Sequence, residues 1–206
     1  MALRQTEVRR MVETAHNYLS DSALLRSSVT LTYKNVAGEH GTASTAEPHI
    51  ELNAQSNGAS LLELTAFEIL LKALCHANDI VLRLAHNYAA IFSALPLALR
   101  ERIGVAVALR LSRPTDDLDS WLQQFQKNFH RLRYPYEAYE GKTDAEVAER
   151  AVEWDISVAE RTMGDDAAVL RDPSVLAGAT FLYLPEELAA LTHAIDHELA
   201  AWLATP

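Results

Sequence analysis

The densest group of side chains able to bind phosphate lies in KNFHRLRYPYEAYEG, which begins at Lys127. Lys127, His130, Arg131 and Arg133 can donate hydrogen bonds to phosphate oxygens, and the tyrosines among them can stack on bases. These tyrosines are Tyr134, Tyr136 and Tyr139. The stretch predicts a surface for single-stranded RNA or a nucleotide. The alternative is a solvated helix face, in which Arg133 pairs with Glu137 one turn away and the tyrosines pack in the core.

A second candidate is the acid and base pair Glu68 and Lys72, which lies within the apolar stretch LLELTAFEILLKALCHA. Buried charges need partners. A glutamate four residues before a lysine is the favourable order for an ion pair within one helix, which predicts a structural pair at the edge of the core. The other interpretation is a polar network that reaches toward a binding site.

A third candidate is the pair His193 and His197, whose spacing of one helical turn would let two imidazoles bind one metal ion. No glutamate directly follows the first histidine, as a zincin motif requires, and two ligands alone make a poor zinc site. We therefore expect no metal site here. A glycine-rich phosphate loop, a nucleophile elbow and a dinucleotide fingerprint are also missing from the sequence, so no cofactor is expected.

The net charge and the cysteine content limit the partners and the cellular location that we expect for this protein. The formal net charge of −10 means that any contact with nucleic acid needs a local basic patch. The single cysteine, Cys75, lies in an apolar helical run, so we expect a buried thiol and a cytoplasmic location. The N-terminal residues lack the apolar stretch of a signal peptide, and no segment offers about 18 uninterrupted apolar residues, so we expect no membrane segment.

The N-terminal part of the chain combines a helical pattern with a strand-like one. In residues 3–19 the apolar positions recur at helical spacing, opposite a charged face, which predicts an amphipathic helix. Val29, Leu31 and Tyr33 then alternate with polar residues, and glycine, serine, asparagine and proline become frequent after them. This pattern predicts a small strand or hairpin near residues 28–55.

The remainder of the chain has a helical pattern that prolines interrupt. Ser60 and Glu63 match a capping box, which predicts that a central, buried helix begins there. Pro114 ends one helical segment, Pro135 should kink or end another, and Pro185 begins an amphipathic terminal helix. Glycine and proline are sparse, at seven each, as expected where long helices form most of the fold. The sequence therefore predicts a mainly α, single-domain protein over residues 1–206.

Three stretches, taken in order, resemble the HEPN (higher eukaryotes and prokaryotes nucleotide-binding) family. LLELTAFEILLKALCHA resembles the family's helix with E-x-x-x-K among apolar residues, HNYAAIFSALPLALRERI resembles its H-x-L-x-x-L-F-x-x-L-P segment, and NFHRLRYPYEAYE resembles a helix reading F-x-x-x-R-Y-x-Y-E. The resemblance covers residues 56–140, flanked by residues 1–55 and by C-terminal helices within 141–206. It implies an antiparallel helical bundle that commonly forms a homodimer, in prokaryotes often in phage defence, toxin–antitoxin pairs or RNA cleavage.

Many members of the HEPN family are metal-independent ribonucleases with an R-x4-6-H motif, and the resemblance places that arginine at Arg133. Counting from Arg133 brings the histidine positions onto residues 138–140, which include Tyr139 but no histidine. A tyrosine, with an ordinary pKa of about 10, is a poor general base at neutral pH. The literal motif match in the chain, Arg10 to His16, lies in the first helix, outside the region of resemblance.

The leading hypothesis is a noncatalytic or atypical HEPN-like domain that binds RNA, a nucleotide or a partner protein encoded nearby, in a prokaryotic defence or toxin–antitoxin module. Its binding residues would share one polar pocket, with His86 beside them. These residues are Arg133, Tyr134, Glu137, Lys127, Glu68 and Lys72. The alternative is an active ribonuclease in which Arg133 holds the phosphate and His130 or His86 carries the proton. A third interpretation is a purely structural, oligomeric interaction protein.

Overall fold

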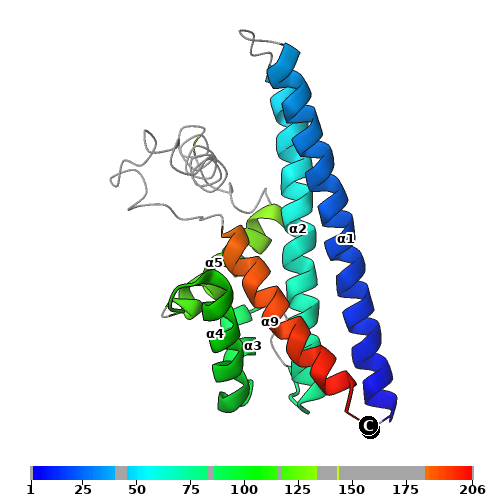
Figure 1. The fold of residues 1–206 in the computed structure, drawn as a ribbon, viewed down its shortest axis with the longest axis vertical. Helices are drawn as coiled ribbons and strands as arrows, with labels where there is room; N and C mark the ends of the chain where they lie inside the picture. The colour runs from blue at the N-terminus through cyan, green and yellow to red at the C-terminus, as the bar shows by residue number, and fades with distance from the viewer. Residues whose placement is uncertain are drawn as a thin grey trace. The chain divides into compact units, whose positions relative to one another are not determined.

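The structure, a computed structural model, describes residues 2–39, 46–82, 86–115, 117–133, 143 and 184–205. Within these ranges the chain is mainly helical and contains no strand (Figure 1). The helices are α1 (Ala2–Glu39), α2 (Ala46–Ala77), α3 (Tyr88–Ser93), α4 (Leu97–Leu111), α5 (Leu118–Arg133) and α9 (Pro185–Leu203). The prediction of a mainly α, helical-bundle fold is confirmed, while its HEPN type stays a prediction.

The chain divides into two compact units. Unit 1 consists of Met1–Ala85 with Thr192–Pro206, and unit 2 consists of His86–Leu191. The boundary between the units falls within α9, which therefore contributes to both. That the two units behave as a single folding domain stays a prediction.

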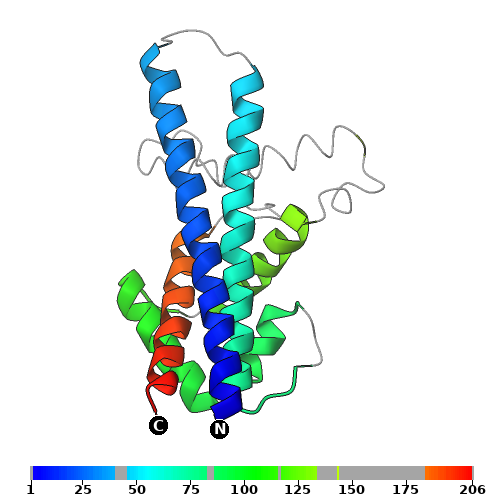
Figure 2. The same ribbon diagram turned by 90° about the vertical axis from the view of Figure 1, so that its right-hand side faces the viewer.

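In unit 1, α1 and α2 lie side by side and run in opposite directions as a long helical hairpin (Figure 2). Their buried apolar residues recur at alternating three- and four-residue steps, which keeps one seam of each helix against the other. On α1 these residues are Val8, Val12 and Ala15, and on α2 they are Leu64, Phe67, Leu71 and Leu74. Ile195 and Leu199 of α9 are also fully buried. The predicted amphipathic first helix is therefore confirmed.

The predicted strand or hairpin near residues 28–55 is wrong, because Val29, Leu31 and Tyr33 lie within α1 and residues 46–55 lie within α2. The chain contains no glycine or proline before Gly38, so nothing in this part of the sequence stops a helix once it has formed. Each residue added to an existing helix gains one backbone hydrogen bond, whereas a short isolated hairpin is marginally stable. Helix extension therefore overrides a β-like alternation of only a few residues.

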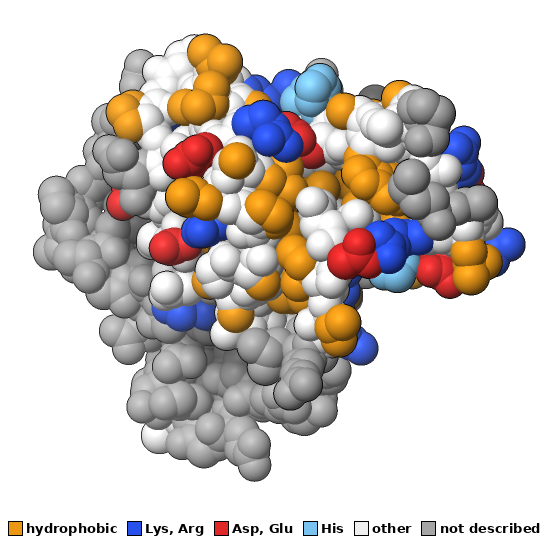
Figure 3. Space-filling model, turned by 90° about the horizontal axis from the view of Figure 1, so that it is seen from below, with side chains coloured by type: hydrophobic (Ala, Val, Ile, Leu, Met, Phe, Trp, Pro, Cys, Tyr) orange, Lys and Arg blue, Asp and Glu red, His pale blue; other side chains and the backbone are white. Residues whose placement is uncertain are grey.

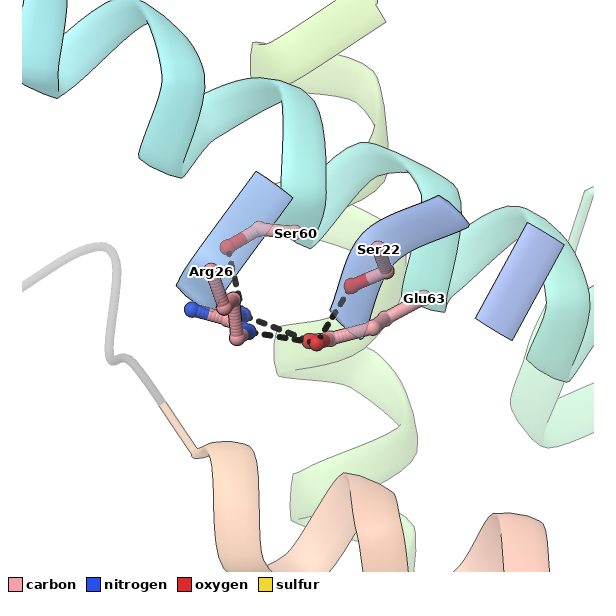
Figure 4. Close-up of polar contacts among 4 residues, drawn as sticks. All are labelled: Ser22, Arg26, Ser60 and Glu63. Atoms are coloured by element: carbon pink, nitrogen blue, oxygen red, sulfur yellow. Dashed lines mark hydrogen bonds and ion pairs between the residues drawn. The ribbon is translucent and has the colours of Figure 1, made fainter. Parts of the chain in front are cut away.

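The predicted capping box at Ser60 and Glu63 is also wrong, because α2 begins at Ala46 and both residues lie inside it. Their side chains contact α1 instead of the backbone of their own helix. Arg26 donates hydrogen bonds to both Ser60 Oγ and the Glu63 carboxylate (Figure 4). A serine followed three residues later by a glutamate thus marks a contact between helices here.

The described part of unit 2 contains α3, α4, α5 and the start of α9, and α4 ends before Pro114 as the sequence predicts. Asn87 caps α3 by accepting a 2.9 Å hydrogen bond from the Ala90 amide, and Pro96 directly precedes α4. α4 ends at Ser112, which adopts the left-handed conformation with φ 53°. α5 is described as far as Arg133, and the predicted kink or stop at Pro135 lies outside the described residues. The apolar residues Trp121, Leu122, Phe125 and Phe129 are buried and form the inner face of α5.

The described helices include none that is both long enough and apolar enough to cross a membrane.

Candidate functional site

The last turns of α5 bring together three of the residues that the sequence suggested for phosphate chemistry. The rings of His86 and His130 have centroids 6.3 Å apart, and both flank the ring of Phe129, at 5.6 and 6.2 Å. On the same helix, Arg133 places its guanidinium carbon 5.6 Å from the centroid of Phe129. His86, Phe129, His130 and Arg133 are called the α5 cluster below.

Apolar packing holds His86 in this position. Asn87, the next residue, caps α3, and Tyr88 begins that helix with its side chain fully buried. The rings of Tyr88 and Phe129 have centroids 6.1 Å apart, so the start of α3 is anchored on α5. Because His86 precedes this anchor by two residues, its imidazole is held near the C-terminal end of α5.

The α5 cluster is open to solvent on its charged side. Lys127 and Arg133 are exposed, whereas His86 and His130 are half-buried. α5 carries Asp119 in its first turn and its basic residues in its second half, as the helix dipole favours. A guanidinium group and two imidazoles can donate several hydrogen bonds to one phosphate group, and a pair of imidazoles can also exchange protons with a substrate.

Several predicted members of this site lie outside the described residues, namely Tyr134, Glu137 and Tyr139. The alternative pairing of Arg133 with Glu137 therefore stays a prediction, as does any role of Tyr139. Sequence reasoning had named His86 from the family resemblance, but no local spacing linked it to α5. Its place follows from the packing of Tyr88 on Phe129.

The predicted ion pair between Glu68 and Lys72 is present in α2, with Lys72 Nζ 2.5 Å from Glu68 Oε1. Glu68 is only 7% exposed, so its carboxylate is desolvated and depends on such partners. The pair belongs to unit 1 and the α5 cluster to unit 2. The single pocket that was predicted to join them stays a prediction.

Lys72 also lines an open groove of about 570 Å³ in unit 1. The other lining residues come from the start of α1, the end of α2 and the segment that follows α2; they are Arg4, Glu7, Met11, His76, Asp79, Ile80, Val81 and Leu82. Arg4 forms an ion pair with Asp79, and His76 Nε2 lies 2.8 Å from Glu7 Oε2. Figure 3 shows basic, acidic and hydrophobic side chains side by side on one face of the molecule. The groove is therefore a mixed surface in which the charges largely neutralise one another.

Sequence reasoning missed two polar contacts that stabilise unit 2. Glu187, in the first turn of α9, is only 1% exposed and forms an ion pair with Arg113, which follows α4. The guanidinium carbon of Arg113 also lies 5.5 Å from the centroid of the Trp121 ring on α5. Arg113 and Glu187 are 74 positions apart, so no local sequence motif predicts the pair. The ion pair with Arg113 therefore gives the buried Glu187 carboxylate a structural role in unit 2.

The described residues contain no group of three or more histidine, cysteine or acidic side chains placed to hold a metal ion. His193 and His197 are both exposed on α9. Asp196 between them lies 2.8 Å from Nε2 of His16 on α1. His16, the histidine of the literal R-x4-6-H match, thus contacts a carboxylate. Arg10, the arginine of that match, is exposed on the same helix.

Comparisons with protein-family models, with curated proteins and with solved structures find no match to this chain.

Proposed function

We propose that this chain binds RNA or a nucleotide through the α5 cluster, as a noncatalytic or atypical HEPN-like protein. The observation that supports the proposal most directly is the position of His86, which lies beside His130 and Phe129 although it is remote from them in sequence. The prokaryotic defence or toxin–antitoxin setting, the homodimer and a partner protein encoded nearby rest on the family resemblance alone.

His86 distinguishes the α5 cluster from an ordinary helix end. Basic residues are favoured near the C-terminus of any helix, because the helix dipole is negative there, so Lys127, His130 and Arg133 alone would carry little weight. His86 is not part of α5, so the composition of that helix does not account for its position beside His130. Its placement next to His130 creates a second hydrogen-bond donor on the same surface.

The overall charge makes such a local surface necessary. With a net charge of −10, the chain as a whole repels polyanions, so RNA binding has to depend on a few closely placed cations. Arg133 is exposed and can bind two phosphate oxygens at once through its planar guanidinium group. Binding should therefore be weakened strongly by salt.

The proposal is tested by charge reversal at Arg133. Fluorescence anisotropy would measure binding of a labelled single-stranded RNA, and of a labelled nucleotide, to the wild type and to Arg133→Glu. A hydrogen bond to a charged group contributes about 1.5–3 kcal/mol, so we expect affinity to fall by at least about tenfold. The matched control is Arg110→Glu, which reverses an exposed arginine on α4 of the same unit and should leave affinity unchanged.

Equal affinities for Arg133→Glu and the wild type would contradict the proposal. If neither probe binds the wild type while the chain forms a stable complex with a protein encoded beside it, an interaction role replaces the binding role. Circular dichroism on each variant would establish that both reversed proteins keep their helices.

A metal-independent ribonuclease is a second candidate, favoured by the 6.3 Å separation of the His86 and His130 rings. One neutral imidazole would take the proton of the ribose 2′-hydroxyl as its oxygen attacks phosphorus, and the other, protonated, would give a proton to the departing 5′-oxygen. Arg133 would stabilise the negative charge on the non-bridging oxygens. The products would be a 2′,3′-cyclic phosphate and a 5′-hydroxyl.

Cleavage assays with excess chelator separate this candidate from binding alone. If His86 and His130 exchange protons with the substrate, His86→Ala and His130→Ala should each slow cleavage by about 100-fold or more, with RNA binding much less affected. His76→Ala, which removes a histidine of unit 1, should cleave as the wild type does. Intact RNA after prolonged incubation with the wild type would dismiss the ribonuclease and leave the binding proposal standing.

A further inference from the structure

The outward face of α9 carries two histidines that the proposed function does not use. His193 and His197 are both exposed, and within the described part of the chain neither imidazole has a hydrogen-bond or ion-pair partner. Ala200 and Ala201, which follow on the same helix, are exposed as well. The two imidazoles are therefore accessible to a metal ion from solvent.

The spacing of the two histidines suits chelation of one metal ion. Residues four apart on a helix are neighbours, with their Cβ atoms about 5–6 Å apart, so both rings can turn toward a common point. Neutral imidazole is the commonest protein ligand of borderline cations such as Zn²⁺, at a bond length of about 2.0–2.1 Å. A histidine pair on one rigid helix needs little reorganisation to bind such an ion.

The described residues of one chain supply only half of the ligands that zinc takes in a closed site, which is why the pattern within a single chain predicts no metal site. Structural zinc sites are almost always tetrahedral, with four protein ligands. Asp196, the carboxylate between the two histidines, already lies 2.8 Å from His16 Nε2, and no third ligand stands in place among the described residues. The described residues therefore leave two of the four ligand positions open.

We propose that His193 and His197 chelate a borderline divalent cation, for which Zn²⁺ is the probe, and that the same two residues of a second copy complete the site. A two-fold contact through α9 would present four imidazoles to one ion, because such a contact uses the same surface on both copies. The exposed alanines allow a second helix to approach closely.

The charge of the protein makes this association depend on the metal. Each copy carries a net charge of −10, so two copies repel one another when no cation lies between them. A bound dication offsets part of that repulsion at the point of contact and supplies the ligand bonds. Removal of the metal should therefore separate the copies.

The test uses the full-length chain after treatment with a chelator and its removal by dialysis. Zinc titration with a colorimetric competitor would give the stoichiometry, and light scattering after size exclusion would give the mass. We expect one zinc ion per two chains, a doubling of mass relative to the metal-free protein, and full reversal by added chelator.

Single substitutions assign the ligands. His193→Ala and His197→Ala should each abolish the mass change and weaken zinc binding by at least about tenfold, because even loss of a hydrogen bond behind a ligand weakens metal sites about 10–100-fold. Both replacements lie on an exposed helix face and favour helix, so they should fold as the wild type does. His76→Ala, which removes a histidine of α2 near Glu7, is the matched control and should behave as the wild type.

Three results would overturn the proposal: no zinc uptake by the wild type, uptake that survives both substitutions, or one zinc ion per chain with no change of mass.

Discussion

The contact between α1 and α2 that Figure 4 shows gives the sharpest prediction about stability. Glu63 Oε1 accepts hydrogen bonds from Ser22 Oγ at 2.7 Å and from Arg26 Nε at 2.5 Å, and Glu63 Oε2 accepts one from Arg26 Nη2 at 2.6 Å. Arg26 Nη2 also donates to Ser60 Oγ at 3.2 Å. The pair is bidentate and largely shielded, with side-chain exposures of 33% for Arg26 and 21% for Glu63.

These exposures place the energy of the pair between two limits. Exposed ion pairs contribute about 0–1 kcal/mol, whereas removal of one partner from a buried pair costs about 3–5 kcal/mol, because the other charge is left desolvated. For a pair that is one-fifth to one-third exposed, we expect Arg26→Leu and Glu63→Leu each to lower the free energy of unfolding by about 2 kcal/mol. The double variant should lose about 2 kcal/mol rather than about 4, since no charge is left alone.

Urea denaturation followed by circular dichroism would measure all four corners of this double-mutant cycle. Glu7→Leu, which removes one partner from the more exposed Glu7–His76 pair, is the control and should cost less than about 1 kcal/mol. Additive losses in the double variant, or single losses below about 0.5 kcal/mol, would refute the prediction that this ion pair stabilises the helical hairpin.

Two further predictions concern a helix end and a buried thiol. Ser112→Gly should raise the free energy of unfolding by about 0.5–1 kcal/mol, because Ser112 ends α4 at φ 53°, where glycine is not strained; an unchanged or lower urea midpoint would contradict this. Burial raises the pKa of the Cys75 thiol from 9.0 to about 11. Between these values the unfolded chain loses the thiol proton and the folded chain keeps it, so stability should fall by up to about 1.4 kcal/mol per pH unit as pH rises from about 9 to about 11. Cys75→Ala should remove that part of the slope, and an identical slope in the variant would show that other groups cause it.

The helices were predictable because local signals place them. Prolines mark the start of α4 and α9, Pro114 lies just beyond the end of α4, and the apolar stripe on α5 corresponds to its buried face. The errors arose where a short pattern competed with a long one. Alternation at Val29, Leu31 and Tyr33 spans too few residues to stop a helix that meets no glycine before Gly38.

The candidate site was predictable only in part, because its contacts join distant segments. Lys127, His130 and Arg133 stand out as a basic group in an acidic chain, and Glu68 with Lys72 follows a one-turn rule. The distance between the His86 and His130 rings depends on how α3 packs on α5, which no spacing encodes. The Arg26–Glu63 and Arg113–Glu187 pairs could not be predicted for the same reason, because each joins residues that are distant in the sequence.

The salt dependence of RNA binding tests the central claim, a phosphate contact made by Arg133, most directly. Anisotropy titrations over a range of salt concentrations would give the slope of the logarithm of the binding constant against the logarithm of salt concentration. We predict that Arg133→Ala reduces the magnitude of this slope by about 0.7, the value for one phosphate contact on a single strand, while Arg110→Ala leaves it unchanged. Equal slopes and equal affinities for Arg133→Ala and the wild type would contradict the account.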